Sequence, residues 1–168
     1  MNVNALRAAQ ARLKEGYKRK PSAALVTLKA YGHVDDGGVA CKVERGRALS
    51  VAGLHPAGGG SGAELCSGDM LLEALVACAG VTLKAVATAL DVALPKAVVR
   101  AEGDLDYRGA LGVDRATPVG FLAIRLYFDL DSDAPADRLD ALVKLTERYC
   151  VVLQTLSRKP ELSVTVNR

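Results

Sequence analysis

Four cysteines are the residues of this sequence best suited to do chemistry, because a thiolate is both a nucleophile and a metal ligand. The two histidines, His33 and His55, are isolated in sequence, and no pair of cysteines has the C-x-x-C spacing of a zinc site. The sequence therefore predicts no metal and no cofactor, and it favours thiol redox chemistry. The four are Cys41, Cys66, Cys78 and Cys150.

Cys78 lies in the middle of an apolar run, MLLEALVACAGVTLKAVATAL, that follows Asp69 and ends at Leu90. Its neighbours at helical spacing are apolar, so we expect it in a hydrophobic environment. A free cysteine is more often a packed side chain than a reagent, and packing alone is one interpretation. If the thiol is reactive, the start of its own helix lies about nine residues away. That is too far to stabilise a thiolate, so the sequence predicts a cation from elsewhere.

Cys150 ends the segment TERYC, with Glu147 three residues before it on the same side of a helix. A neighbouring carboxylate raises the pKa of a thiol, so Cys150 is expected to be a poorer first nucleophile than Cys78. It could still attack an oxidised sulfur and close a disulfide. We interpret Cys41 as a packed strand residue and Cys66 as an incidental residue of a mobile loop.

The elements that must position these thiols alternate between helices and strands. Alternating apolar residues predict strands, and apolar residues at spacings of three and four predict helices. The order of elements indicates an α+β fold with mostly antiparallel pairing. We expect a helix over 2–20, strands over 23–34, 39–44 and 47–53 in an antiparallel meander, a flexible Gly-rich lid over 54–68, a buried central helix over 69–90, strands over 96–109 and 120–132, a helix from 135 toward 157 with a break near Cys150, and a final strand over 161–168.

Composition limits the classes of function. The chain has 168 residues, half of them apolar and 24% charged, which predicts one globular domain and not a disordered chain. A net charge of +3 and 4% aromatic residues argue against nucleic acid. Glu73 and Lys84 bracket only ten residues, which argues against a membrane span. The first twenty residues lack the apolar core of a signal peptide, so we expect a cytoplasmic protein.

Three segments resemble the family of osmotically induced proteins and organic hydroperoxide resistance proteins, OsmC and Ohr. They are CSGDMLLEALVACAGVTLKAVA (66–87), PVGFLAIRLYFDLD (118–131) and TERYCVVLQTL (146–156), and the run EGDLDYRG (102–109) adds to them. The resemblance covers about residues 22–168, so an OsmC-like domain over 22–168 would follow an N-terminal helical extension over 1–21. It implies an intertwined α+β homodimer with antiparallel sheets around buried central helices and active sites at the subunit interface.

The resemblance also implies roles for individual residues. Cys78 would attack the peroxide and become a sulfenic acid, and Cys150 would resolve it. Arg45 or Arg47, in the turn before the third strand, matches the position of the family's activating arginine, and Asp69 would support that arginine. The implied substrate is a small apolar hydroperoxide, and the implied reductant is a thiol, either a lipoylated protein or another dithiol.

This sequence departs from the family pattern at two places. Gly68 and Asp69 stand where the peroxidases carry a carboxylate, and Val151 follows Cys150 where proline is common. Two other functions therefore stay open: a non-catalytic dimer that binds a small lipophilic ligand, and a thiol redox sensor. Closely spaced Cys78 and Cys150 thiols would favour catalysis over ligand binding.

Overall fold

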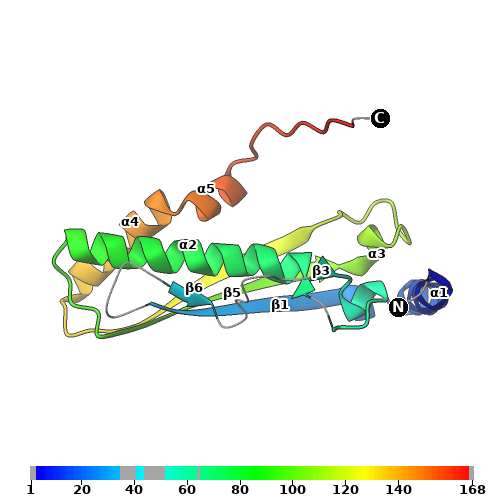
Figure 1. Ribbon diagram of the computed structural model, residues 1–168, viewed down its shortest axis with the longest axis horizontal. Helices are drawn as coiled ribbons and strands as arrows, with labels where there is room; N and C mark the ends of the chain where they lie inside the picture. Colours follow the sequence, from blue (N-terminus) through cyan, green and yellow to red (C-terminus); the bar gives the residue numbers. More distant parts are fainter. Residues whose placement is uncertain (1–2, 35–40, 44–51, 64, 167–168) are drawn as a thin grey trace.

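The computed structural model describes residues 3–34, 41–43, 52–63 and 65–166. One long helix lies across a sheet in these residues, and shorter helices flank it (Figure 1). The elements are α1 (Val3–Arg19), the 3-10 turn η1 (Pro21–Ala24), β1 (Leu25–Val34), β2 (Cys41–Val43), β3 (Ala52–Gly53), the 3-10 turn η2 (Pro56–Gly58), β4 (Leu65–Cys66), α2 (Ser67–Ala89), β5 (Lys96–Asp106), α3 (Tyr107–Ala110), β6 (Phe121–Asp131), α4 (Ala136–Tyr149) and α5 (Val151–Ser157).

The main sheet has the order β2-β1-β5-β6, and each neighbouring pair is antiparallel. The α+β fold and the hairpin of β1 and β2 are therefore confirmed. Residues of β5 alternate between the two faces of the sheet, as a strand requires. Ala97, Val99 and Ala101 belong to the same hydrophobic core as the buried face of α2.

The opposite face of the sheet carries charges in pairs across neighbouring strands. Arg125 of β6 contacts Asp104 of β5 at 2.6 Å, and Arg100 contacts Asp129 at 2.8 Å. Arg125 holds the pKa of Asp104 down at about 2. Such a polar face favours solvent, so the sheet uses its other face to pack against α2.

Helix α2 is apolar on two faces but buried on only one. Its buried face is made of Leu72, Leu75, Val76, Ala79 and Leu83. A second stripe repeats at spacings of three and four residues and stays half-exposed, with Leu71 and Val81 each 37% exposed. The expectation of a helix buried all round is thus only partly met. By length and composition α2 could also cross a membrane, a test that core helices pass as well.

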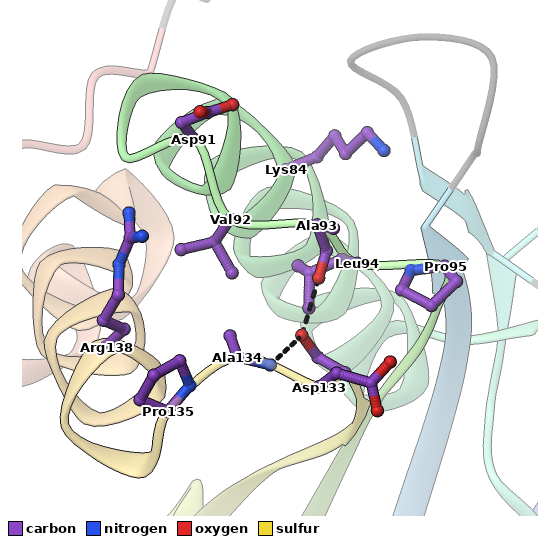
Figure 2. Close-up of a pocket in the computed structure, with 11 residues that line it drawn as sticks. Lys84, Asp91, Val92, Ala93, Leu94, Pro95, Asp133, Ala134, Pro135 and Arg138 are labelled. Atoms are coloured by element: carbon purple, nitrogen blue, oxygen red, sulfur yellow. Dashed lines mark hydrogen bonds between the residues drawn. The ribbon is translucent and has the colours of Figure 1, made fainter.

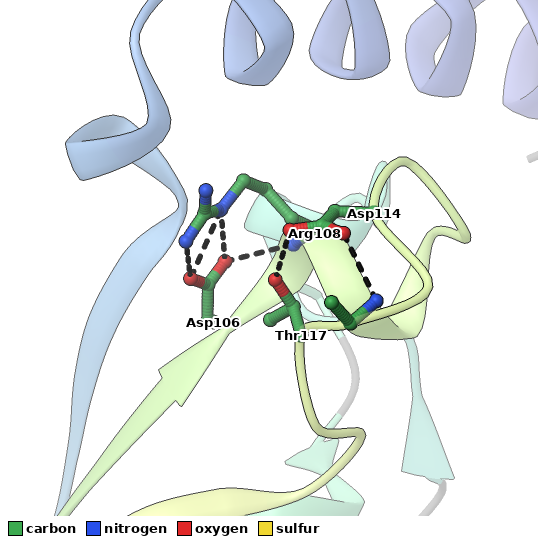
Figure 3. A network of polar contacts seen from close by, with 5 residues as sticks. Asp106, Arg108, Asp114 and Thr117 are labelled. Atoms are coloured by element: carbon green, nitrogen blue, oxygen red, sulfur yellow. Dashed lines mark hydrogen bonds and ion pairs between the residues drawn. The ribbon is translucent and has the colours of Figure 1, made fainter.

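A buried ion pair fastens the far end of β5 (Figure 3). Asp106 is 2% exposed, and its two carboxylate oxygens accept from Nε of Arg108 at 3.1 and 3.0 Å. Helix α1 docks beside this corner, where the Tyr17 hydroxyl donates to the carbonyl of Ala57 at 2.8 Å. The pair orients α3, which is a single helical turn. The sequence predicts a strand over 96–109, but β5 ends at Asp106 and α3 follows it.

Three other expectations about strands and loops need correction. The sequence predicts that the strand over 47–53 belongs to an antiparallel meander. In the structure, β3 instead pairs in parallel with β4 in a separate two-stranded sheet. The expected lid carries the η2 turn, where buried Gly58 lies against the ring of Tyr107. The expected last strand is extended but unpaired over 161–166, because no neighbouring strand edge lies against it among the described residues. In Figure 1 this C-terminal segment leaves the body of the molecule.

Candidate active site

Cys78 and Cys150 meet where the middle of α2 packs against the joint between α4 and α5. Cys150 is the residue between the two helices, with φ −70° and ψ 105°, and it is fully buried. This extended residue turns the chain, so the predicted break at Cys150 is confirmed. The two thiols lie close enough that each one shifts the pKa of the other.

The Cys78 thiol is surrounded by neutral hydrogen-bond donors. Burial raises its pKa, but the backbone N–H of Val152, the Cys150 thiol, the backbone N–H of Val151 and the Thr82 hydroxyl together outweigh burial. The pKa of Cys78 therefore lies below its ordinary value. The backbone N–H donors, those of Val151 and Val152, belong to the first turn of α5. They do not belong to α2, the helix that holds Cys78, and the first N–H groups of a helix are free to bond to another group.

The Cys150 thiol has the opposite tendency. Burial raises its pKa to about 11, and the neighbouring Cys78 adds to the increase. The sequence predicted the direction of this difference but attributed it to Glu147. Burial and Cys78 are the causes in the structure, so that attribution is wrong.

Of the other predicted site residues, the structure describes Asp69 alone, and Asp69 does not join this pair. Arg45 and Arg47 lie outside the described residues. Asp69 is in the first turn of α2, about 14 Å along the helix axis from Cys78 at 1.5 Å per residue. It lies near Tyr107, whose pKa rises through burial and through the neighbouring Cys66 and Asp69.

The interpretation of Cys66 as an incidental loop residue is wrong. Cys66 is buried and forms the N-cap of α2, and its thiol lies close enough to Tyr107 to help raise the pKa of that hydroxyl. The ring of His55 stacks on Tyr107 with centroids 5.5 Å apart. The two-residue strand that holds Cys66 has no periodicity that a sequence pattern could reveal.

An apolar groove of about 530 Å³ lies on the same side of α2 as Cys78. Leu71 lines it from α2, seven residues before Cys78 and so on the same face of the helix. Leu153 and Leu156 line it from α5, and Phe121 and Ile124 line it from β6. The groove is apolar and shares the α2 face of Cys78, but neither Cys78 nor Cys150 is among the residues that line it.

A family model described as OsmC-like protein matches residues 58–165 of the chain. The chain belongs to the OsmC-like protein family. The match includes both thiols of the pair, while α1 and β1 lie outside it. The resemblance noted in the sequence is thereby confirmed.

Two solved structures share the fold of this OsmC-like chain. An OsmC-like hydroperoxide resistance protein from Jannaschia sp. CCS1 is similar with a TM-score of 0.64 and 18% identity, over 86% of this chain and 95% of that one. An OsmC-like protein from Mycoplasma pneumoniae has a TM-score of 0.56 and 13% identity, over 79% of this chain and 85% of that one. No curated protein matches the chain. At these identities the solved structures establish the fold alone.

A second groove of the OsmC-like chain, of about 780 Å³, lies beyond the C-terminal end of α2 (Figure 2). Its walls carry charges of both signs. Lys84 and Arg138 are positive, and Asp91 and Asp133 are negative. The Ser132 hydroxyl donates to the carbonyl of Ala93 at 2.6 Å and ties the two walls together. The charged walls of this groove suit an apolar substrate less well than the groove lined by Leu71 and Phe121 does. In the described part of the chain no cluster of three metal-ligating side chains occurs.

Proposed function

We propose that this OsmC-like protein is a thiol-dependent peroxidase that reduces small apolar organic hydroperoxides. The observation that carries the proposal is that Cys78, a thiol of lowered pKa, packs against the core that holds Cys150, a buried thiol of raised pKa, and that each shifts the pKa of the other. A peroxidase of this kind needs one thiolate for attack and one protonated thiol for resolution. The groove lined by Leu71, Phe121 and Leu153 supports an apolar substrate.

The chemistry balances over three steps. The Cys78 thiolate attacks the terminal oxygen of the hydroperoxide, the O–O bond breaks, and the alkoxide takes a proton to leave as an alcohol. The sulfur of Cys150 then attacks the Cys78 sulfenic acid, which releases water and closes a disulfide. A dithiol reductant reduces this disulfide and returns both thiols, which suits a reducing compartment such as the cytoplasm.

The active unit of this proposal is a homodimer. Cys78 stands in the half-exposed stripe of α2, and its neighbours there are apolar. Residues at this heptad spacing pack against a second helix in coiled coils, so the stripe suits α2 of a second copy. A partner helix would close the open side of the Cys78 site. The stripe consists of Leu71, Ala74, Cys78, Val81 and Ala85.

The contact between the thiols favours a peroxidase over a simple ligand-binding dimer. A binding protein whose cysteines only pack has no need for two neighbouring thiols whose pKa values are shifted in opposite directions. Arg45 or Arg47 would add a positive charge to the site and stabilise the departing alkoxide. A redox sensor would use the same two residues but would stop at the disulfide, so turnover separates these two functions.

The test is stopped-flow mixing of the reduced protein with cumene hydroperoxide. We expect the loss of two thiols per chain and the formation of one disulfide, then repeated turnover when a dithiol is present. Cys78→Ser should abolish the reaction, and Cys150→Ser should leave a single oxidation that yields a sulfenic acid.

Cys66→Ser is the matched control, because Cys66 is also a free, buried cysteine. It caps the N-terminus of α2, far along the helix from Cys78. It should consume hydroperoxide like the unmodified protein. Thiol loss that persists in Cys78→Ser, or none in the unmodified protein, would contradict the proposal. One turnover without a second, in the presence of several dithiols, would support the sensor.

A further inference from the structure

Helices α4 and α5 meet at a break that a single torsion angle creates. Cys150 has the φ of a helical residue, −70°, but its ψ of 105° is extended. In a continuous helix the carbonyl of Glu147 accepts from the N–H of Val151, four residues later. The extended ψ of Cys150 turns that N–H away from α4, so the carbonyl of Glu147 loses its ordinary helical partner.

The residues that follow Cys150 do not enforce this break by themselves. A proline at position 151 would enforce it, because proline lacks the N–H and disfavours the helical conformation in the residue before it. The chain has Val151 and Val152 there, and each carries an N–H that a longer helix could use. The break is therefore held by contacts made across it.

A side-chain hydrogen bond spans the break. The amide Nε2 of Gln154 donates to the carbonyl oxygen of Glu147 at 2.9 Å. Gln154 is the fourth residue of α5, and helical side chains tilt toward the start of their helix, so this amide reaches back to the last turn of α4. The backbone N–H of Gln154 donates to the carbonyl of Cys150 at 2.9 Å and belongs to α5. Gln154 thus occupies the carbonyl that the N–H of Val151 would take if the two helices joined.

We propose that Gln154 is a positioning residue that keeps α4 and α5 from joining into one helix, and so holds α5 against α2. Val152 and Leu153 of α5 pack against the core that includes the buried face of α2, and Leu153 and Leu156 line the apolar groove. A joined helix would leave α4 in another direction and take this groove wall with it. The inference deepens the proposed function and rests on it for the role of Cys78 as the first nucleophile.

The break matters to Cys78 because the backbone groups that interact with its thiol follow Cys150. The N–H groups of Val151 and Val152 help to lower the pKa of Cys78. In a joined helix both would bond to carbonyls of α4 instead. The Cys78 thiol would keep the burial that raises its pKa and lose two of the donors that oppose it. Cys150 is the titratable group that interacts with Cys78 among the described residues, so each variant below keeps it.

The experiment measures alkylation of Cys78 by iodoacetamide against pH, with the modified peptide quantified by mass spectrometry. Gln154→Met keeps the length and the helix propensity of the side chain and removes the donor, so the midpoint of the profile should move to higher pH. One neutral hydrogen bond changes an equilibrium about fivefold, which sets the largest expected loss of thiolate below the midpoint. Because a thiolate of higher pKa is more reactive, the rate there should fall about twofold while the high-pH plateau rises about twofold.

Two further variants complete the test. Adding Val151→Pro to Gln154→Met imposes the break without the amide, because proline fits the first position of α5 and keeps Cys150 extended. The midpoint should then return toward that of the unmodified protein.

Glu147→Gln changes the side chain but keeps the carbonyl that Gln154 binds, so it should leave the midpoint unchanged. An unmoved midpoint in Gln154→Met would overturn the proposal, as would a shift that the proline does not reverse or that Glu147→Gln reproduces. Iodoacetamide involves no peroxide, so an unmodified protein that fails to consume hydroperoxide would overturn the proposed function and leave this result standing.

Discussion

The described groups that lower the pKa of Cys78 are all uncharged, and this makes the site depend on geometry at close range. A hydrogen bond weakens steeply with distance and angle, whereas the attraction between charges extends over many ångströms. Val151 and Val152 donate only because Cys150 leaves the helical conformation before them. The acidity of one thiol is thus set by the backbone angles of the residue that carries the other.

The buried carboxylate of Asp106 depends on a single side chain in the same way. Arg108→Ala would leave Asp106 charged, buried and without its guanidinium partner, and we expect a clear loss in the free energy of unfolding. Arg108 lowers the pKa of Asp106, so this contribution is present above the ordinary pKa of a carboxyl and is lost as the pH falls through the lowered one. The difference between variant and unmodified protein should therefore shrink in acid. Urea denaturation at neutral and acidic pH measures it.

Arg115→Ala is the control for that prediction, because Arg115 is exposed in the loop that follows α3. Its unfolding free energy should stay within about 0.5 kcal/mol of the unmodified protein. An equal loss from both variants, or a loss from Arg108→Ala that does not change with pH, would show that the ion pair is not the cause.

The two thiols could be predicted from sequence because each stands in a recognisable context, an apolar helix for Cys78 and a helix boundary for Cys150. Their hydrogen-bond donors could not, since Cys78 and Val152 are far apart in sequence and meet only in the folded chain. The expectation that a helix terminus could not serve Cys78 failed for this reason. It considered the helix that holds the thiol and not the helix that packs against it.

At the scale of elements, the Gly-rich connection before α2 packs closely around Gly58 and Gly60. A Cβ added at Gly60 would lie 1.6 Å from the carbonyl oxygen of Leu54, so the loop folds back on its own backbone. We expect Gly60→Ala to lower the free energy of unfolding by at least about 2 kcal/mol, because the overlap is with backbone and cannot be relieved by rotating a side chain. Thermal and urea denaturation measure the change.

Gly16→Ala provides a matched substitution with the opposite expected sign. Gly16 is in α1, and a Cβ there would meet nothing within 4 Å. Alanine should stabilise the helix by about 0.5–1 kcal/mol, because glycine loses more backbone entropy on folding. If Gly60→Ala is as stable as the unmodified protein, the close approach to Leu54 does not exist in solution.

The long periodic elements were predictable, and the short ones were not. Helices α1 and α2 and strands β1 and β6 carry enough repeats for their period to be recognised. Strand β4 has two residues and α3 has four, which is too few for any period. The turn of α3 begins at Asp106, whose side chain caps it by accepting from the N–H of Arg108 at 3.0 Å. Because of this cap the strand ends at Asp106, whereas the alternation of residues in the sequence predicts a strand up to residue 109.

At the scale of the whole molecule, the exposed stripe of α2 predicts that the chain associates. Val81→Glu would place a charge in the middle of the stripe, and burying it against a second helix would be strongly unfavourable. We expect this variant to be a monomer and the unmodified protein a dimer in sedimentation velocity. Val119→Glu is the control, because Val119 is 77% exposed in a loop and should leave the dimer intact. A monomeric unmodified protein would remove the basis for a shared active site.

The C-terminal segment gives a last prediction, which links association to local structure. Leu162, Val164 and Val166 alternate as in a strand yet are 75%, 92% and 72% exposed, while β6 keeps one edge without a partner strand among the described residues. A strand gains its stability from a neighbouring edge, so we expect this segment to pair with the free edge of β6 in a second copy. Backbone amides of residues 161–166 should therefore exchange slowly with deuterium in the dimer and rapidly in the Val81→Glu monomer. Rapid exchange in both would mean that the alternation of these residues has no structural role in the assembly.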